Sequence, residues 1–94
     1  MKKVLIIEDN EDNIYLMRKI LQKERYDVIE ASDGATGVEL AINKKPNIII
    51  LDIQLPVLDG YSATKKIREN EISKEVIIII ISSYALGDEK KKKL

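Results

Sequence analysis

Five polar side chains that could do chemistry stand directly after apolar segments of this 94-residue sequence. They are Glu8, Asp9, Asp52, Ser82 and Ser83. Three carboxylates brought close together repel one another unless a pKa rises or a cation binds. Oxygen ligands without histidine or cysteine favour a hard ion, with Mg²⁺ as the first choice. A divalent ion beside serine hydroxyls forms a clamp for a phosphoryl group, and Asp52 is then placed to be the nucleophile.

These side chains become neighbours only if the apolar segments are strands of one parallel sheet. Residues 4–7, 48–51 and 76–81 are unbroken aliphatic runs, which are typical of strands covered on both faces. Residues 27–31 alternate in polarity and fit an edge strand. Because the carboxyl ends of parallel strands lie along one edge, where open α/β sheets bind their ligands, we expect a single site there.

Helical patterns separate these strands. Apolar residues repeat at helical spacing in three groups: Ile14, Met17, Ile20 and Leu21; Ala35, Val38, Ala41 and Ile42; and, more weakly, Tyr61, Thr64 and Ile67. Asn10 or Asp9, then Asp33 and Asp59, stand where N-caps are expected. The predicted order is β-α-β-α-β-α-β, with residues 85–94 as a candidate helical stub. Right-handed crossovers then place helices on both faces of a parallel sheet.

Composition narrows the class of function. The 16 basic and 16 acidic residues balance, so no overall charge attracts nucleic acid or an acidic membrane. The absence of cysteine and histidine excludes disulfides, thiolate chemistry and imidazole bases. The apolar stretch at residues 4–7 is too short for a signal peptide or a membrane span. We therefore expect one soluble, cytoplasmic domain.

A plainer interpretation exists for each polar residue taken singly. Glu8 and Asp9 could cap the first helix, and Ser82 could simply end a strand. Their occurrence together at one predicted edge favours a functional site.

At this point three motifs resemble a known family. VLIIEDNEDN (4–13), IIILDIQLPVLDGY (48–61) and VIIIIISSYAL (76–86) look like the strand ends of receiver domains of two-component response regulators. The resemblance implies a flavodoxin-like three-layer sandwich with a parallel sheet of strand order 2-1-3-4. It also implies that a phosphoryl group passes from the phosphohistidine of a histidine kinase or phosphotransfer protein to an aspartate.

Carried over residue by residue, the resemblance makes Asp52 the phosphoacceptor and Ser82 the hydroxyl that turns toward the phosphoryl group. Glu8, Asp9 and Asp52 would hold Mg²⁺ together with the Gln54 backbone carbonyl. Such a module is not an enzyme in the usual sense, because it does no more than accept a phosphoryl group and slowly lose it.

The sequence also departs from the family pattern. Ser83 replaces a usual alanine, and Leu55 replaces a common methionine. The fifth strand, with its lysine, and the fifth helix of the family have no counterpart in the sequence, so residues 1–94 are interpreted as one truncated receiver-like domain. A further possibility is that one of Lys90, Lys91, Lys92 and Lys93 replaces that lysine, although a solvated tail is the simpler interpretation.

If the order is 2-1-3-4, the fourth strand becomes an aliphatic edge and one sheet face loses a helix. Such an edge invites pairing with another chain, so we expect a homodimer through the fourth strand and the uncovered face. The alternative is a marginal, aggregation-prone fragment.

Two functions therefore compete. The first is a Mg²⁺-dependent phosphoacceptor; the second is a phosphorylation-impaired receiver that acts only by dimerisation or interaction. An aspartyl-phosphate hydrolase is disfavoured because Gln54 stands where its second aspartate belongs. A nucleotide or flavin binder is disfavoured because residues 8–12 are acidic rather than glycine-rich.

Overall fold

The computed structural model describes residues 1–81, in which strands and helices alternate. The elements are β1 (Lys3–Ile7), α1 (Glu11–Lys23), β2 (Asp27–Ala31), α2 (Gly34–Asn43), β3 (Ile48–Asp52), α3 (Gly60–Glu69) and β4 (Ile77–Ile81). The predicted alternation of strand and helix is confirmed. The predicted helical stub at residues 85–94 lies outside the described residues.

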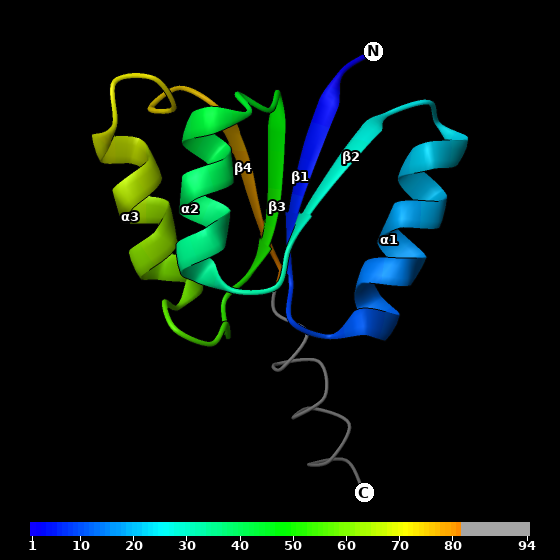
Figure 1. Cartoon of the computed structure of the whole chain (residues 1–94), viewed down its shortest axis with the longest axis horizontal. Helices are drawn as coiled ribbons and strands as arrows, with labels where there is room; N and C mark the ends of the chain where they lie inside the picture. Colours follow the sequence, from blue (N-terminus) through cyan, green and yellow to red (C-terminus); the bar gives the residue numbers. More distant parts are fainter. Residues whose placement is uncertain (82–94) are drawn as a thin grey trace, which may run out of the picture.

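The strands form one parallel sheet in the order β2-β1-β3-β4 (Figure 1). The register places Ile7 between Ala31 and Leu51, and Asp52 opposite Ile81. All carboxyl ends therefore meet at one edge, where the chain turns from β1 into α1 and from β3 toward α3. The predicted strand order and the flavodoxin-like fold are confirmed.

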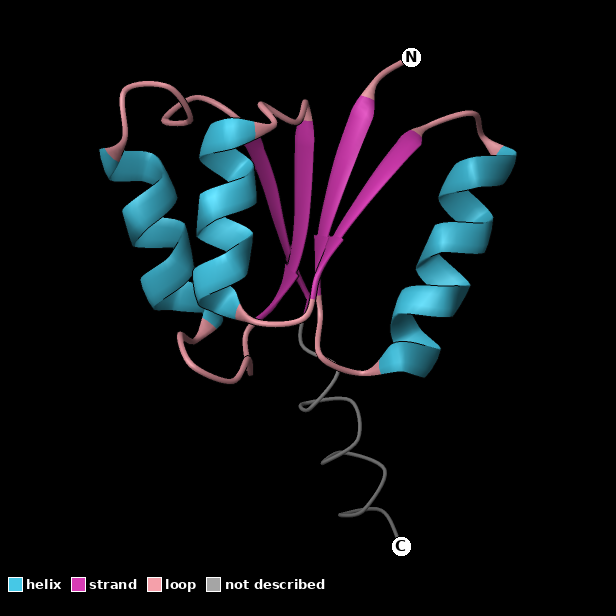
Figure 2. Cartoon of the chain, in the orientation of Figure 1, coloured by secondary structure: helices cyan, strands magenta, loops and turns pink. Residues whose placement is uncertain are grey.

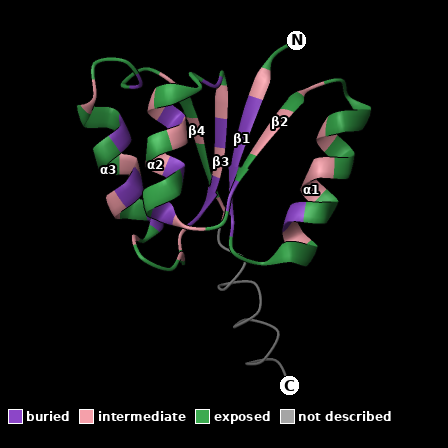
Figure 3. Cartoon of the chain, viewed as in Figure 1, coloured by how far each residue is buried: buried purple, intermediate pink, exposed green. Residues whose placement is uncertain are grey.

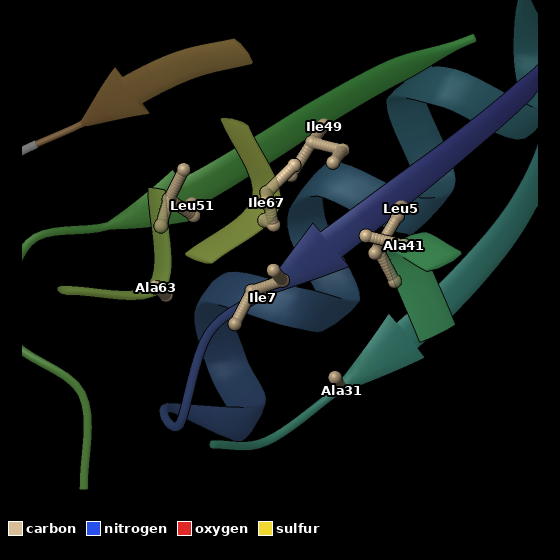
Figure 4. Close-up of a cluster of buried hydrophobic side chains, with 8 residues drawn as sticks. All are labelled: Leu5, Ile7, Ala31, Ala41, Ile49, Leu51, Ala63 and Ile67. Atoms are coloured by element: carbon tan, nitrogen blue, oxygen red, sulfur yellow. The ribbon is translucent and has the colours of Figure 1, made fainter. Parts of the chain in front are cut away.

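Helices cover both faces of this sheet, which gives the three predicted layers. Helix α1 lies on one side, whereas α2 and α3 lie together on the other (Figures 1 and 2). The larger core lies between the sheet and the α2–α3 pair, and Figure 4 shows its side chains converging from both. Its buried members are Leu5, Ile7, Ala31, Ala41, Ile49, Leu51, Ala63 and Ile67. A smaller core of Val4, Ile6 and Ile14 lies under α1.

Short polar side chains begin each helix. The Asn10 side chain accepts a hydrogen bond from the Asn13 backbone N–H at 3.0 Å. The Asp33 and Asp59 carboxylates do the same for the N–H groups of Thr36 and Ser62, at 2.8 and 2.9 Å. These caps satisfy N–H groups that have no partner within the helix. The predicted caps are confirmed, and of the two candidates for α1 the cap is Asn10.

The predicted apolar stripes were partly wrong. Tyr61 and Ile20 are each 63% exposed, and Ala35 is also exposed. On α3 the predicted Ile67 is buried, but the other buried residues are Gly60 and Ala63 rather than Tyr61 and Thr64, and Figure 3 shows the buried segments of this helix in purple. Small residues lie on the buried side because the α2–α3 pair packs closely onto the sheet. The apolar spacing therefore placed the first two residues of the α3 stripe one position too late, and it placed Ile67 correctly.

Strand β4 is the least covered strand. Ile77 is 59% exposed and Ile79 is 48% exposed, whereas Ile78 packs against the larger core. The register pairs Ile77 with Ile48 and Ile79 with Ile50, so these two side chains share the sheet face that carries α1. Ile80, which is 39% exposed, pairs with Leu51 and lies on the other face. None of the helices in the described part of the chain has the length and apolar character needed to cross a membrane.

Candidate functional site

An acidic cluster lies at the carboxyl edge of the sheet, between β1 and β3. Carboxylate oxygens of Glu8, Asp9 and Asp52 all lie within 4.8 Å of one another. Glu8 and Asp52 are buried, with 0% and 3% of their surface exposed, whereas Asp9 is exposed. The parallel pairing of β1 with β3 brings these residues together, because each follows the last paired residues of its strand. The predicted convergence of the three carboxylates is confirmed.

Glu8 is fixed by hydrogen bonds on both carboxylate oxygens. The Asn13 side-chain amide donates to Oε1 at 2.7 Å, and the Asp9 backbone N–H donates to Oε2 at 3.1 Å. The Glu8 backbone N–H donates to the Ala31 carbonyl at 3.0 Å, which anchors the strand end to β2. The side chain is therefore held in one place, with α1 supplying the amide.

The electrostatics of the cluster favour the protonated form of Glu8. Burial raises the pKa of Glu8 from 4.5 to about 7. The hydrogen bond from Asn13 acts in the opposite direction, while the hydrogen bond and like charge of Asp52 raise the pKa further. The carboxylates therefore repel one another here, and a cation that removed this repulsion would bind favourably.

Asp52 is the last residue of β3, and backbone contacts hold the loop that follows it. The Gln54 backbone N–H donates to Asp52 Oδ1 at 3.1 Å. The Ile53 N–H donates to the Ile81 carbonyl at 3.1 Å, and the Gly60 N–H donates to the Ile53 carbonyl at 2.8 Å. The start of α3 and the end of β4 thus position the residues that directly follow Asp52.

Two hollows flank the cluster, and Asp9 lines both. The first, about 650 Å³, lies between the start of α1 and the end of β2, where Arg18 and Glu30 form an ion pair. The second, about 550 Å³, lies between the β1 end, the β3–α3 loop and Tyr61. Asp9 is therefore the member of the acidic cluster that borders both hollows, whereas neither Glu8 nor Asp52 is among the described residues that line them.

The sequence missed one residue of the site and predicted others that lie outside the described residues. Asn13 was not predicted. An amide in the first turn of a helix that follows an acidic strand end does indicate a possible hydrogen-bond donor to that acidic residue. The predicted hydroxyl Ser82 lies beyond residue 81, as do Ser83 and the lysines at 90–93. For Gln54 the structure shows a hydrogen bond from its N–H to Asp52, and its carbonyl as a metal ligand stays a prediction.

The donor set fits a hard divalent cation. Three carboxylates converge, and two of them are buried. Oxygen ligands of this kind suit Mg²⁺ or Ca²⁺ better than softer metals. A bound cation would also favour the ionised form of Glu8, whose pKa is raised first by burial and further by Asp52.

The fold and the cluster define a class of protein, namely flavodoxin-like domains with an acidic site at the carboxyl edge of a parallel sheet. Within that class, the chain belongs to the response regulator receiver domain family, which matches residues 4–94.

Curated relatives support this assignment. Polar-differentiation response regulator DivK from Brucella anthropi is 33% identical over 91 residues, which is 96% of this chain and 74% of DivK. The Brucella ovis protein of the same name is 34% identical over the same shares.

Solved structures agree in fold. The receiver domain of sensor histidine kinase PA1611 from Pseudomonas aeruginosa is 36% identical with a TM-score of 0.86, over 96% of this chain and 74% of that one. That structure has a magnesium ion coordinated in its active site cleft. Chemotaxis response regulator CheY4 of Vibrio cholerae is 27% identical with a TM-score of 0.82, over 98% and 79% of the two chains.

Proposed function

We propose that this chain accepts a phosphoryl group on Asp52 from the phosphohistidine of a histidine kinase or phosphotransfer protein. The observation that carries the proposal is the cluster of buried Glu8 and Asp52 with exposed Asp9 at the sheet edge of a receiver-family chain. Asp52 is the member that ends β3, and it accepts a hydrogen bond from the Gln54 N–H in the loop that follows. Its carboxylate is thus held in place beside that of Asp9, which lines both hollows.

The reaction requires no general base from the protein. A carboxylate oxygen of Asp52 attacks phosphorus, the nitrogen–phosphorus bond of the donor breaks, and an oxygen–phosphorus bond forms. The electron pair of the broken bond stays on the imidazole ring, which takes one proton from water. Later attack of water on phosphorus returns Asp52 and releases inorganic phosphate. A chain without histidine can support both steps.

Mg²⁺ is the proposed cofactor, held by Glu8, Asp9, Asp52 and the Gln54 backbone carbonyl. When bound, such an ion neutralises the negative charge of the carboxylates and of the phosphoryl oxygens. The residues contribute by position: Asn13 orients Glu8, and the Gln54 N–H orients Asp52. Ser82 stays the proposed hydroxyl that responds to the phosphoryl group.

The proposed module is not an enzyme that acts on a separate substrate, because the phosphoryl group goes to its own side chain. Its working partners are proteins, with no role for nucleic acid or membrane, and its compartment is the cytoplasm. The balanced charge and the absence of cysteine are in keeping with this setting.

The test is phosphorylation by a small donor. We expect that incubation with Mg²⁺ and phosphoramidate adds one phosphoryl group, detected by intact mass, and that a chelator prevents it. Asp52→Ala abolishes the addition. Asp27→Ala is the matched control, because that exposed aspartate lies at the opposite edge of the sheet. The proposal fails if the wild-type chain gains no group, or if Asp52→Ala still gains one.

A second candidate function is interaction alone, in which a phosphorylation-impaired receiver acts as a homodimer. The observation that favours it is the exposure of Ile77 and Ile79 on β4. Within residues 1–81, β4 pairs only with β3, so its other edge carries backbone groups able to pair with a second copy. A two-fold axis perpendicular to the strand at this edge would join two β4 strands antiparallel.

Mass and phosphorylation together separate the two candidates. A dimer by light scattering at micromolar concentration, with no phosphoryl group gained, supports interaction alone. A phosphorylated chain supports the first function whatever its mass. A monomer that gains no group contradicts both.

A further inference from the structure

The loop between β3 and α3 contains a strained residue. Val57 has a φ of 69°, and the Leu58 N–H donates to the Pro56 carbonyl at 2.7 Å, which closes a γ-turn around it. A positive φ is a marked outlier for a β-branched side chain. Val57 is also 82% exposed, so packing within residues 1–81 does not compensate for the strain. Strain kept at the surface beside a site points to a functional contact.

The same loop forms the wall of the second hollow. Leu55 and Pro56 line it from the loop, and Tyr61 lines it from the first turn of α3. Tyr61 is 63% exposed, so the hollow presents an aromatic ring and aliphatic groups to its surroundings. Val57 follows Pro56 directly in the sequence and is exposed beside this wall, without lining the hollow itself. This group of residues, Leu55, Pro56, Val57 and Tyr61, is called the apolar rim below.

The apolar rim is continuous with the phosphoacceptor site. Asp9 belongs both to the acidic cluster and to the lining of the hollow. Gln54 also lines the hollow, and its N–H donates to Asp52. A protein that brings a phosphoryl group to Asp52 past the β3–α3 loop therefore places its neighbouring residues over or beside this hollow. The carboxylates of Asp9 and Asp59 at its border favour a cation in the same place.

We propose that the apolar rim is a specificity pocket for the phosphodonor protein. It takes an apolar side chain that stands about one helical turn from the donor histidine, with a basic residue of the donor near Asp9 and Asp59. Val57 is held outward by its turn so that the donor covers it. This inference rests on the proposed function, because it identifies how the partner of Asp52 is recognised.

The test compares a protein donor with a small donor. A panel of autophosphorylated histidine kinase cores and phosphotransfer domains is first tested for the protein donor that phosphorylates the wild-type chain fastest. The initial rate of phosphorylation of each variant is then measured with that protein donor and with phosphoramidate. The readout is the ratio of the protein-donor rate to the phosphoramidate rate. This ratio cancels effects on folding and on the chemistry at Asp52.

We expect Tyr61→Ala to lower the ratio about tenfold, as truncation of a central aromatic contact does. Val57→Gly keeps the turn and relieves its strain while removing the side chain, and we expect a fall of about threefold. Tyr61→Phe restores the ratio, because the ring and not the hydroxyl fills the pocket. Ile72→Ala is the matched control, since Ile72 is 58% exposed beyond the end of α3.

Several results would overturn the proposal. One is an unchanged ratio in Tyr61→Ala and Val57→Gly, and another is an equal fall in Ile72→Ala. Phosphorylation of the wild type by phosphoramidate but by no protein of the panel also counts against it. If Tyr61→Ala instead abolishes self-association at an unchanged ratio, the pocket belongs to a second copy of the chain. Failure of the proposed function is distinct, because phosphoramidate then leaves Asp52 unmodified.

Discussion

Glu8 is the residue whose chemistry is most sensitive to its surroundings. It is fully buried, it contacts Asp52, and its pKa is raised to about 7 mainly by burial. The folded chain without metal therefore keeps a proton on Glu8 that the unfolded chain, with a pKa near 4.5, has already lost. This difference makes the stability of the metal-free chain depend on pH.

The first prediction follows from the sign of that difference. A raised pKa means that the contribution of Glu8 to stability is fully present below about pH 4.5 and is lost as pH rises through about 7. The change amounts to roughly 3 kcal/mol at most, since one pKa unit corresponds to roughly 1.4 kcal/mol. Urea unfolding in a chelator should show the loss between pH 5 and pH 8.

Glu8→Gln is the control for this prediction, because glutamine imitates the neutral acid and still accepts the Asn13 hydrogen bond. We expect its stability to change much less across that range. Equal pH dependence in the two chains would mean that another group causes it. Excess Mg²⁺ should reduce the loss in the wild type, because a bound cation stabilises the ionised carboxylate.

At the scale of elements, the start of α3 lies directly against the phosphoacceptor loop. A Cβ added at Gly60 would lie 2.4 Å from the Asp52 carbonyl oxygen and 2.7 Å from Ile53 Cα. These are backbone atoms, so a larger side chain can be accommodated only if the helix or the loop moves. The absence of a side chain at Gly60 is therefore what lets α3 hold Asp52 in position.

The second prediction is that Gly60→Ala destabilises the chain and slows phosphorylation at Asp52. Overpacking of this kind costs about 1–3 kcal/mol, and the shifted loop moves the attacking carboxylate. Gly37→Ala serves as a comparison, because its Cβ would meet the side chain of Ile7 rather than backbone. Alanine also favours the interior of α2.

Urea unfolding and the rate of phosphorylation by phosphoramidate test this pair. We expect Gly37→Ala to lower stability less than Gly60→Ala and to leave the rate per folded molecule near that of the wild type. An equal or faster rate in Gly60→Ala would show that the contact between α3 and the loop does not position Asp52.

The elements also show which features the sequence could predict. Helix starts were predictable, because Asn10, Asp33 and Asp59 cap their helices through contacts within three residues. The convergence of Asp52 with the acidic pair was predictable as well, since parallel strands share one carboxyl edge. Local pattern and topology sufficed in both cases.

Features that depend on packing between elements were not predictable. The contact of Asn13 with Glu8 depends on how α1 meets the end of β1. The outward position of Tyr61 depends on how closely Gly60 and Ala63 approach the sheet. The positive φ of Val57 was likewise hidden, because nothing about valine predicts a γ-turn.

At the scale of the whole molecule, the sheet is covered unevenly. Helices α2 and α3 together cover one face, whereas α1 covers the other face over β1 and β2 (Figures 1 and 3). Ile77 and Ile79 are left exposed on β4 beside the partly buried Ile48 and Ile50. A contiguous aliphatic surface at a strand edge marks an interaction site or a site of aggregation.

The last prediction concerns self-association through this edge. If folded chains pair through β4, association stabilises the folded state, so Tm rises with protein concentration. We expect such a rise between micromolar and hundred-micromolar wild-type chain, together with a mass approaching that of a dimer. The double variant Ile77→Lys and Ile79→Lys places charges on the edge and should abolish the concentration dependence. Leu16→Lys, at a 60% exposed position on α1, should keep it. A wild-type chain whose Tm and mass stay constant across that range would exclude pairing through β4. The dependence of Tm on protein concentration, and not Tm itself, decides the outcome, so a lower Tm caused by the lysines does not affect the test.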